Sequence, residues 1–261
     1  MSGNFAIVIR IVVLLFLFFG STFFGSVLPG SCQDSDDYGP YELPGKVMEM
    51  PEELRPGNLF EGYRPLQLHV QWHTIPHWLA GEWVSSQYRM LRSWDHNSGA
   101  YYTVPSSSNV YQRDHMGDLR DAKGTVWMAL ISPDITDVDM GNEIDCQNVI
   151  AIKVVKAEER SFALRKRIFH VEFDRQSRKI NDAYTEERVT EYALVGPSAV
   201  VAAVFNRFYD CNGSMTATTT GGRKLSLERE FVNVPSRNQI DLVLSLREHL
   251  QNVGLGDLIA Y

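Results

Sequence analysis

The stretch that decides the fold is Trp78-Leu79-Ala80-Gly81-Glu82-Trp83, and the segment Val84-Ser85-Ser86-Gln87-Tyr88-Arg89-Met90 follows it directly. Apolar and polar residues alternate from Glu82 to Trp94, which is the period of a half-buried β-strand. Residues 95–99 then form a turn rich in Asn and Gly, and a second apolar run covers residues 100–104. Because Asn and Gly tolerate positive φ, this pattern predicts an antiparallel hairpin. The residues expected on one face of its first strand are Val84, Tyr88, Met90 and Trp94.

The same kind of pattern repeats toward the C-terminus. Breakers such as Gly196-Pro197 and Gly221-Gly222 separate the apolar runs. Evenly spaced strands with short turns favour a mainly β fold, an antiparallel meander closed as a barrel, with a β-sandwich as the alternative. The further strands are expected at residues 109–116, 125–131, 148–157, 161–174, 183–194, 199–210, 214–220 and 223–232.

One of these strands has an irregular pattern. Phe162 and Leu164 share one face of the strand at residues 161–174, whereas Phe169 and Val171 have the opposite parity. A strand that keeps a single buried face therefore needs a β-bulge near Lys166. Such a bulge aims one basic residue toward the interior, and the alternative is a basic outer face that pairs with nearby acids.

The chain ends in a predicted helix over residues 238–253. Ser236 and Gln239 have the spacing of a capping box, and apolar residues follow at helical steps from Ile240 to Leu250. Gly254 is placed to end the helix. Its apolar stripe predicts packing on its own domain, with docking to a partner as the alternative.

The Gly81-x-Trp83 step and the order of elements resemble lipocalin-like, calycin-type β-barrels over a domain at residues 68–261. The resemblance implies that Trp83 closes one end of the barrel. It also implies that an arginine from a late strand covers the indole, with Arg229 as the candidate and Arg223 as the alternate.

The N-terminus predicts export. Residues 1–31 carry one charged side chain, Arg10, ahead of a long apolar run and small residues, as in a signal peptide or membrane anchor. Leu28-Pro29-Gly30-Ser31-Cys32 looks like a lipobox, which makes Cys32 a candidate for acylation. A lipoprotein, a cleaved signal and a retained anchor all stay open. The expected location is periplasmic or extracytoplasmic and attached to the membrane through the N-terminus, with secretion as the alternative.

Residues 32–67 are predicted to form an acidic, proline-rich tether, because frequent prolines prevent long helices and inner strands. Several aromatic residues in this segment indicate that part of it lies along the domain. Cys146 and Cys211 are an even pair in an oxidising compartment and are candidates for a disulfide, whereas two free thiols are the alternative.

Charge and motifs exclude several classes of function. The chain has 25 Lys and Arg against 32 Asp and Glu, so without residues 1–31, which hold only Arg10, the net charge is 24 − 32 = −8. Nucleic-acid binding, which requires a basic face, is therefore not expected. The histidines at 69, 73 and 77 are interrupted by Pro76, and the acidic stretch at residues 134–143 lacks the EF-hand spacing, so no metal is expected. No catalytic or cofactor motif is present, and the chain is not expected to be an enzyme.

The function that this pattern favours is a membrane-tethered, lipocalin-like binding protein for a small apolar or amphipathic molecule. The alternative is a non-catalytic structural or assembly protein of the cell envelope, with an envelope protein as its partner. The residues expected to line the interior of the barrel are Tyr88, Met90, Trp94, Tyr102, Trp127 and Phe205.

Overall fold

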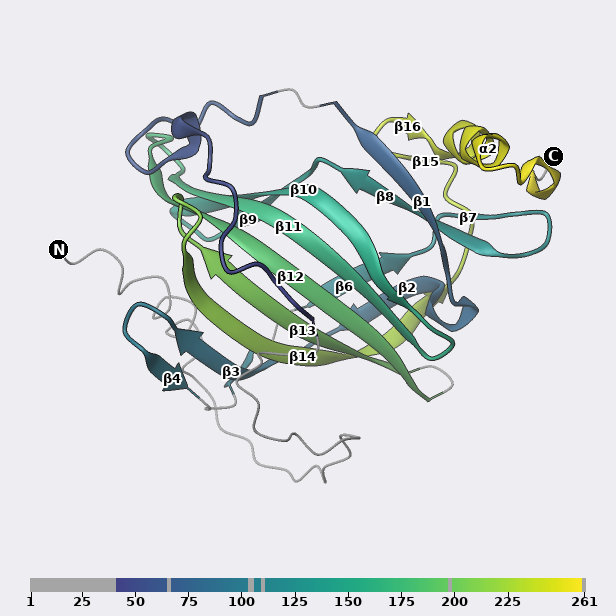
Figure 1. Ribbon diagram of the computed structural model, residues 1–261, viewed down its shortest axis with the longest axis horizontal. Coiled ribbons are helices and arrows are strands. Elements are labelled where there is room, and N and C mark those ends of the chain that lie inside the picture. The colour runs from purple at the N-terminus through teal and green to yellow at the C-terminus, as the bar shows by residue number, and fades with distance from the viewer. Residues whose placement is uncertain (1–40, 65–66, 103–105, 109–110, 197–198, 260–261) are drawn as a thin grey trace.

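The computed structural model describes residues 41–64, 67–102, 106–108, 111–196 and 199–259 (Figure 1). The acylation candidate Cys32 and the export segment lie outside these residues. Among the described helices, none has the length and apolar character that a membrane crossing requires. The strands are β1 (His69–Ile75), β2 (Gly81–Ser85), β3 (Tyr88–Asp95), β4 (Ala100–Tyr102), β5 (Ser106–Ser108), β6 (Gln112–Met116), β7 (Leu119–Arg120), β8 (Val126–Ser132), β9 (Asp134–Asp139), β10 (Glu143–Ala157), β11 (Ser161–Asp174), β12 (Ile180–Gly196), β13 (Ala199–Tyr209), β14 (Met215–Glu230), β15 (Ser236–Arg237) and β16 (Ile240–Asp241); the helices are α2 (Leu242–Asn252) and 3-10 turns at Glu52–Leu54, His77–Leu79 and Gly256–Leu258.

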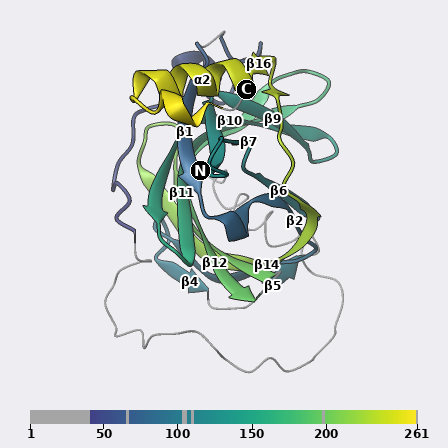
Figure 2. The same ribbon diagram turned by 90° about the vertical axis from the view of Figure 1, so that its right-hand side faces the viewer.

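A mainly β, antiparallel fold with one helix near the C-terminus is confirmed. The main sheet has 11 strands and is strongly curved (Figure 2). Its central run is β14-β13-β12-β11-β10-β9, and β14 pairs with β2 through one half and with β3 through the other. Strand β6 adds to β2, and no pairing among the described residues joins β6 to β9. The hydrogen bonding of the sheet is therefore open at these two ends.

Strand β14 runs through Gly221-Gly222, so the turn predicted there is wrong. The absence of side chains at these glycines instead allows β3 to lie close to β14. A Cβ on Gly221 would lie 2.3 Å from the hydroxyl oxygen of Tyr88 and 2.7 Å from the carbonyl oxygen of Arg89. Any larger residue would push β3 away from β14.

A second sheet, ordered β1-β8-β7, separates the main sheet from helix α2. Strand β8 is buried on both faces: Met128 and Leu130 pack with Trp83 and Leu225 in the inner core, while Ile131 packs with α2. His69 and His73 share one face of β1 and His77 lies in the 3-10 turn that follows, and no group of three metal-binding side chains gathers in the described part of the chain.

The helix begins later than the sequence predicted. Asn238 and Gln239 have φ of 51° and 64° and form the turn of a small hairpin between β15 and β16. Asp241 then caps α2, because its side chain accepts a hydrogen bond from the backbone N–H of Leu244. Gly254, with φ of 77°, follows the last turn as predicted.

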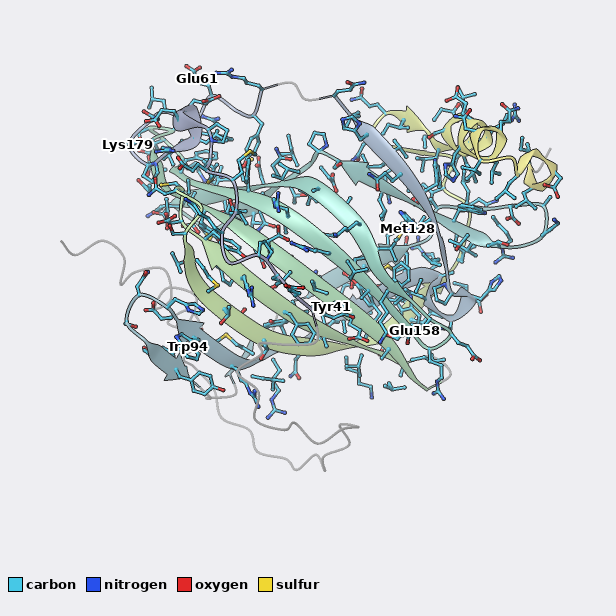
Figure 3. All side chains as sticks on the ribbon, viewed as in Figure 1. Tyr41, Glu61, Trp94, Met128, Glu158 and Lys179 are labelled. Atoms are coloured by element: carbon cyan, nitrogen blue, oxygen red, sulfur yellow. The ribbon has the colours of Figure 1, made fainter. Side chains whose placement is uncertain are left out.

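The segment at residues 41–64, here called the arm, is not a solvated tether. Leu43, Met50, Leu54 and Phe60 are all buried. They pack on the outer face of the main sheet, defined as the face that carries Ala163 and Val171 of β11. Figure 3 shows Tyr41 lying across this sheet. Of the predicted tether, residues 41–64 therefore belong to the domain.

The arm explains the parity of β11. Both faces of this strand are buried, Phe162 and Leu164 in the inner core and Phe169 and Val171 under the arm. The strand pairs with β12 without interruption from Ser161 to Glu172, so it contains no bulge at Lys166. The register shifts lie in the neighbouring strand β10 instead.

Candidate functional site

The inner face of the main sheet is packed at one end and hollow at the other. The inner core fills the end near Trp83. Beyond it lies a cavity of about 680 Å³, whose lining comes from β3, β6 and β10–β14. Because side chains alternate along a strand, the lining residues of β11 and β12 are nearly all of one parity. They are Leu164, Lys166, His170 and Glu172 of β11 and Asp182, Tyr184, Glu186, Arg188, Thr190 and Tyr192 of β12, with Ala183 as the exception.

Of the six residues predicted to line the interior, Tyr88 and Met90 do so. Trp94 lies on the opposite face because Leu91 forms a β-bulge. Met90 pairs with Gly221 and Arg92 with Thr220, which leaves Leu91 as an extra residue. After this residue the faces exchange, so that Ser93 and Asp95 line the cavity.

The other three predicted lining residues lie elsewhere. Tyr102 is exposed on the β3–β4 hairpin. Trp127 packs under α2, with its indole N–H donating to Asp121 at 2.9 Å. Phe205 faces outward and contacts Tyr41, with ring centroids 6.0 Å apart. The assignments of Trp127 and Phe205 failed because these side chains pack against α2 and the arm, and not on the inner face of the main sheet.

Of the residues assigned to barrel closure, Trp83 and Gly81 are tightly packed, whereas Arg229 lies on the other face of the sheet. Trp83 is 1% exposed, and its indole N–H donates to the carbonyl oxygen of Leu79 at 2.8 Å. Gly81 has φ of 137°, and a Cβ there would lie 2.7 Å from the carbonyl oxygen of Arg229. The side chain of Arg229, however, is 63% exposed and pairs with Glu82. Since Arg229 lies opposite Glu82 and Leu227 opposite Trp83, Arg229 is on the wrong face to cover the indole.

The candidate disulfide is not formed. Cys146 and Cys211 are free thiols, although both pack against the cluster around Phe173. Burial raises the pKa of the Cys146 thiol, and the neighbouring Asp137 raises it further. Cys146 is therefore a structural thiol rather than a reactive one.

A chain of buried ion pairs crosses one wall of the cavity. Nδ1 of His170 lies 3.0 Å from Oδ2 of Asp145, and Nε2 lies 3.0 Å from Oε2 of Glu186. Glu186 also accepts two hydrogen bonds from Arg188. Burial lowers the pKa of His170, but the two carboxylates outweigh this effect and raise the pKa to about 9. His170 is thus an imidazolium at neutral pH, and neither ring nitrogen is available as a base.

Glu186 remains ionised in this chain. Burial raises its pKa, but the guanidinium of Arg188 and the imidazolium of His170 lower it to about 2. The ring of Tyr184 stacks on His170, with centroids 4.4 Å apart and planes at 10°. The stack and the two carboxylates fix the orientation of the imidazole ring.

A second group on the same inner face is cationic. Arg223 contacts Asp114 at 2.5 Å and also donates to Gln112. Burial lowers the pKa of Lys166, and the charges of Arg188 and Arg223 lower it further, while the carboxylates of Asp114 and Asp134 act in the opposite direction. We call Lys166, Arg188 and Arg223 the cation centre.

The far end of the cavity carries acids. Burial and the neighbouring carboxylates of Asp182, Asp145 and Glu143 raise the pKa of Glu172 to about 7. Burial also raises the pKa of Asp182. The cavity therefore has an acidic end and a cationic end.

No known protein family, curated protein or solved structure matched this chain. The geometry of the cavity therefore carries the functional argument. The arrangement offers ion pairs, hydrogen-bond donors and apolar walls for holding a molecule, and its histidine is fully engaged.

Sequence reasoning missed the charged lining. The available signal was in β12, where Tyr184, Glu186, Arg188, Thr190 and Tyr192 are spaced two apart and therefore share a face. Opposite charges on one face of a strand with a buried second face indicate a polar interior.

Proposed function

We propose that this chain is a lipocalin-like binding protein that holds a small amphipathic molecule in the inner-face cavity. The observation that carries the proposal is the cavity of about 680 Å³ itself. This volume lies within the range of about 300–1,000 Å³ of small-molecule sites. Its lining combines apolar residues such as Met90, Leu164 and Phe208 with charged ones, which suits a molecule with both characters.

The lipocalin-like part of the proposal rests on the order of elements. A curved antiparallel sheet is followed by a C-terminal helix, and Trp83 plugs the packed end of the inner face. In this proposal the sheet wraps around the ligand as a barrel, with a sandwich as the alternative. Export by residues 1–31 and acylation at Cys32 complete the proposal, with the N-terminal sequence as their support.

The proposal is tested by filling the cavity. Val204 lines it and is buried, whereas Val201 of the same strand is 37% exposed. We expect N-phenyl-1-naphthylamine, a neutral fluorescent probe, to bind the wild-type protein and to gain fluorescence. Val204→Trp should weaken this binding at least tenfold because the indole occupies the probe's space, and Val201→Trp should leave it unchanged.

Two outcomes would count against the proposal. Equal binding to both variants would place the probe outside the cavity. Absence of binding to wild-type protein, together with copurification of an envelope protein, would favour the alternative of a non-catalytic envelope scaffold. Circular dichroism of both variants checks that the fold is retained.

A further inference from the structure

The cation centre contains one cation without a partner. Arg188 is bonded to Glu186, and Arg223 is bonded to Asp114. No hydrogen bond or ion pair joins Nζ of Lys166 to another residue in the described ranges. A lysine ammonium facing a cavity among two arginines is unfavourable unless an anion is nearby.

The carboxylates closest to the cation centre are held by other partners. Asp114 is bonded to Arg223, and Glu186 is bonded to His170 and Arg188. Asp114 and Asp134 act on Lys166 through their charge, without an ion pair or hydrogen bond to it in the described part of the chain. Lys166 is therefore the member of the cation centre whose amino group has no bonded partner.

A second observation points to the same place. The side chain of Arg223 is 8% exposed, and its Nε is buried without a hydrogen-bond partner among the described residues. A buried N–H of a guanidinium that lacks an acceptor is rare in proteins. Arg223 and Lys166 line the same cavity, so this donor and the amino group of Lys166 belong to one site.

We propose that the cation centre binds the carboxylate of an amphipathic acid, with Lys166 as the ion-pair partner and Nε of Arg223 as a hydrogen-bond donor. Met90, Leu164 and Val204 also line the cavity and provide apolar surface for the hydrocarbon part. This inference rests on the proposed binding function and names the class of its ligand.

The test compares two probes that differ only in the head group, decanoate and 1-decanol, by calorimetry at pH 7. We expect wild-type protein to bind decanoate at least tenfold more tightly, since hydrogen bonds to charged groups are strong when desolvated. Lys166→Met should remove this preference by weakening the binding of decanoate. Lys153→Met, which removes an exposed lysine of β10, is the matched control and should keep the preference.

A second measurement uses only wild-type protein, in case the variant folds poorly. The carboxyl of bound [1-13C]decanoate should titrate well below the pKa of the free acid, because neighbouring cations favour its charged form. A raised pKa would place the carboxyl in apolar surroundings and overturn the inference. Equal affinity for both probes would also overturn it while the binding function stands. Failure of both probes to bind would refute the binding function as well.

Discussion

Nε2 of His170 lies 3.0 Å from Oε2 of Glu186 on the neighbouring strand, and the two residues are 3% and 1% exposed. Such a pair is stable only if both groups are charged, because a neutral imidazole would leave the buried carboxylate without its second cation. With Asp145 on the other ring nitrogen, the imidazolium is the stable form in the fold.

The charge of His170 predicts a stability that decreases with pH. Its pKa is raised to about 9 in the folded protein, against 6.5 for an unperturbed histidine. The stabilisation is therefore complete below pH 6.5 and is lost as the pH rises through 9. The shift corresponds to at most about 3 kcal/mol of unfolding free energy.

This prediction is measured by NMR and urea unfolding. One of the seven histidine Cε1–H resonances should titrate near pH 9 and be missing in His170→Gln. The free energy of unfolding of the variant should also decrease less than that of the wild type between pH 6.5 and 9. A resonance of His170 that titrates near 6.5 would refute the charged form.

Glu172→Gln should stabilise the protein at high pH. Burial and the acids around it raise the pKa of Glu172 to about 7, so its ionisation is unfavourable in the fold. The charged form of Glu172 destabilises the fold above pH 7. This effect disappears as the pH falls below 4.5, the pKa of the carboxyl in the unfolded chain. Because the residue keeps some contact with solvent, we expect Glu172→Gln to raise the free energy of unfolding by about 1–2 kcal/mol at pH 8 and to change it very little at pH 4.5.

Chemical denaturation at the two pH values measures this difference. Glu61→Gln, on the exposed part of the arm, is the control and should change stability by less than about 0.5 kcal/mol. A gain that is equal at both pH values would show that the charge of Glu172 is not its cause.

Gly221→Ala should separate β3 from β14. The new Cβ would lie 2.3 Å from the hydroxyl oxygen of Tyr88 and close to the backbone of Arg89, so the strands have to move apart. We expect Gly221→Ala to lower the free energy of unfolding by about 1–3 kcal/mol. The thermal unfolding midpoint measures it, with Gly196→Ala as the control, since the nearest atom to a Cβ there is 3.8 Å away.

Phe60→Ala tests whether the arm is part of the folded domain. Phe60 is 4% exposed and packs on Phe173, with ring centroids 4.8 Å apart, whereas Leu59 is 61% exposed. We expect Phe60→Ala to lower the free energy of unfolding by about 3–5 kcal/mol and Leu59→Ala by less than about 0.5 kcal/mol. Similar, small losses in urea unfolding of both variants would contradict the packing of the arm.

The existence of β10, β11, β12 and β13 could be predicted from periodicity because turn residues separate them, and the limits of β11 and β13 agree to within one residue. Faces were harder to assign. The bulge at Leu91 exchanges the faces of β3, and nothing in the local alternation marks it. The burial of Phe169 under the arm depends on residues more than a hundred positions earlier, which a strand pattern cannot show.

Two residues of the cavity lining could be predicted from the sequence, whereas the charges of the lining could not. Tyr88 and Met90 could be found because they follow the alternation of their strand. The ion pairs of His170 could not, since its partners lie on β10 and β12 and their approach depends on register. An unpaired lysine such as Lys166 is recognised only when its neighbours in space are known.

The packed arm limits how far the protein can reach. If Cys32 carries lipid as proposed, residues 32–40 are the only link between the lipid and Tyr41, which is nine residues (40 − 32 + 1). A fully extended chain spans at most about 3.5 Å per residue, so this linking segment is no longer than roughly 30 Å. The cavity would then work in a thin layer next to the bilayer, where a captured amphipathic acid can be taken from or returned to the same membrane.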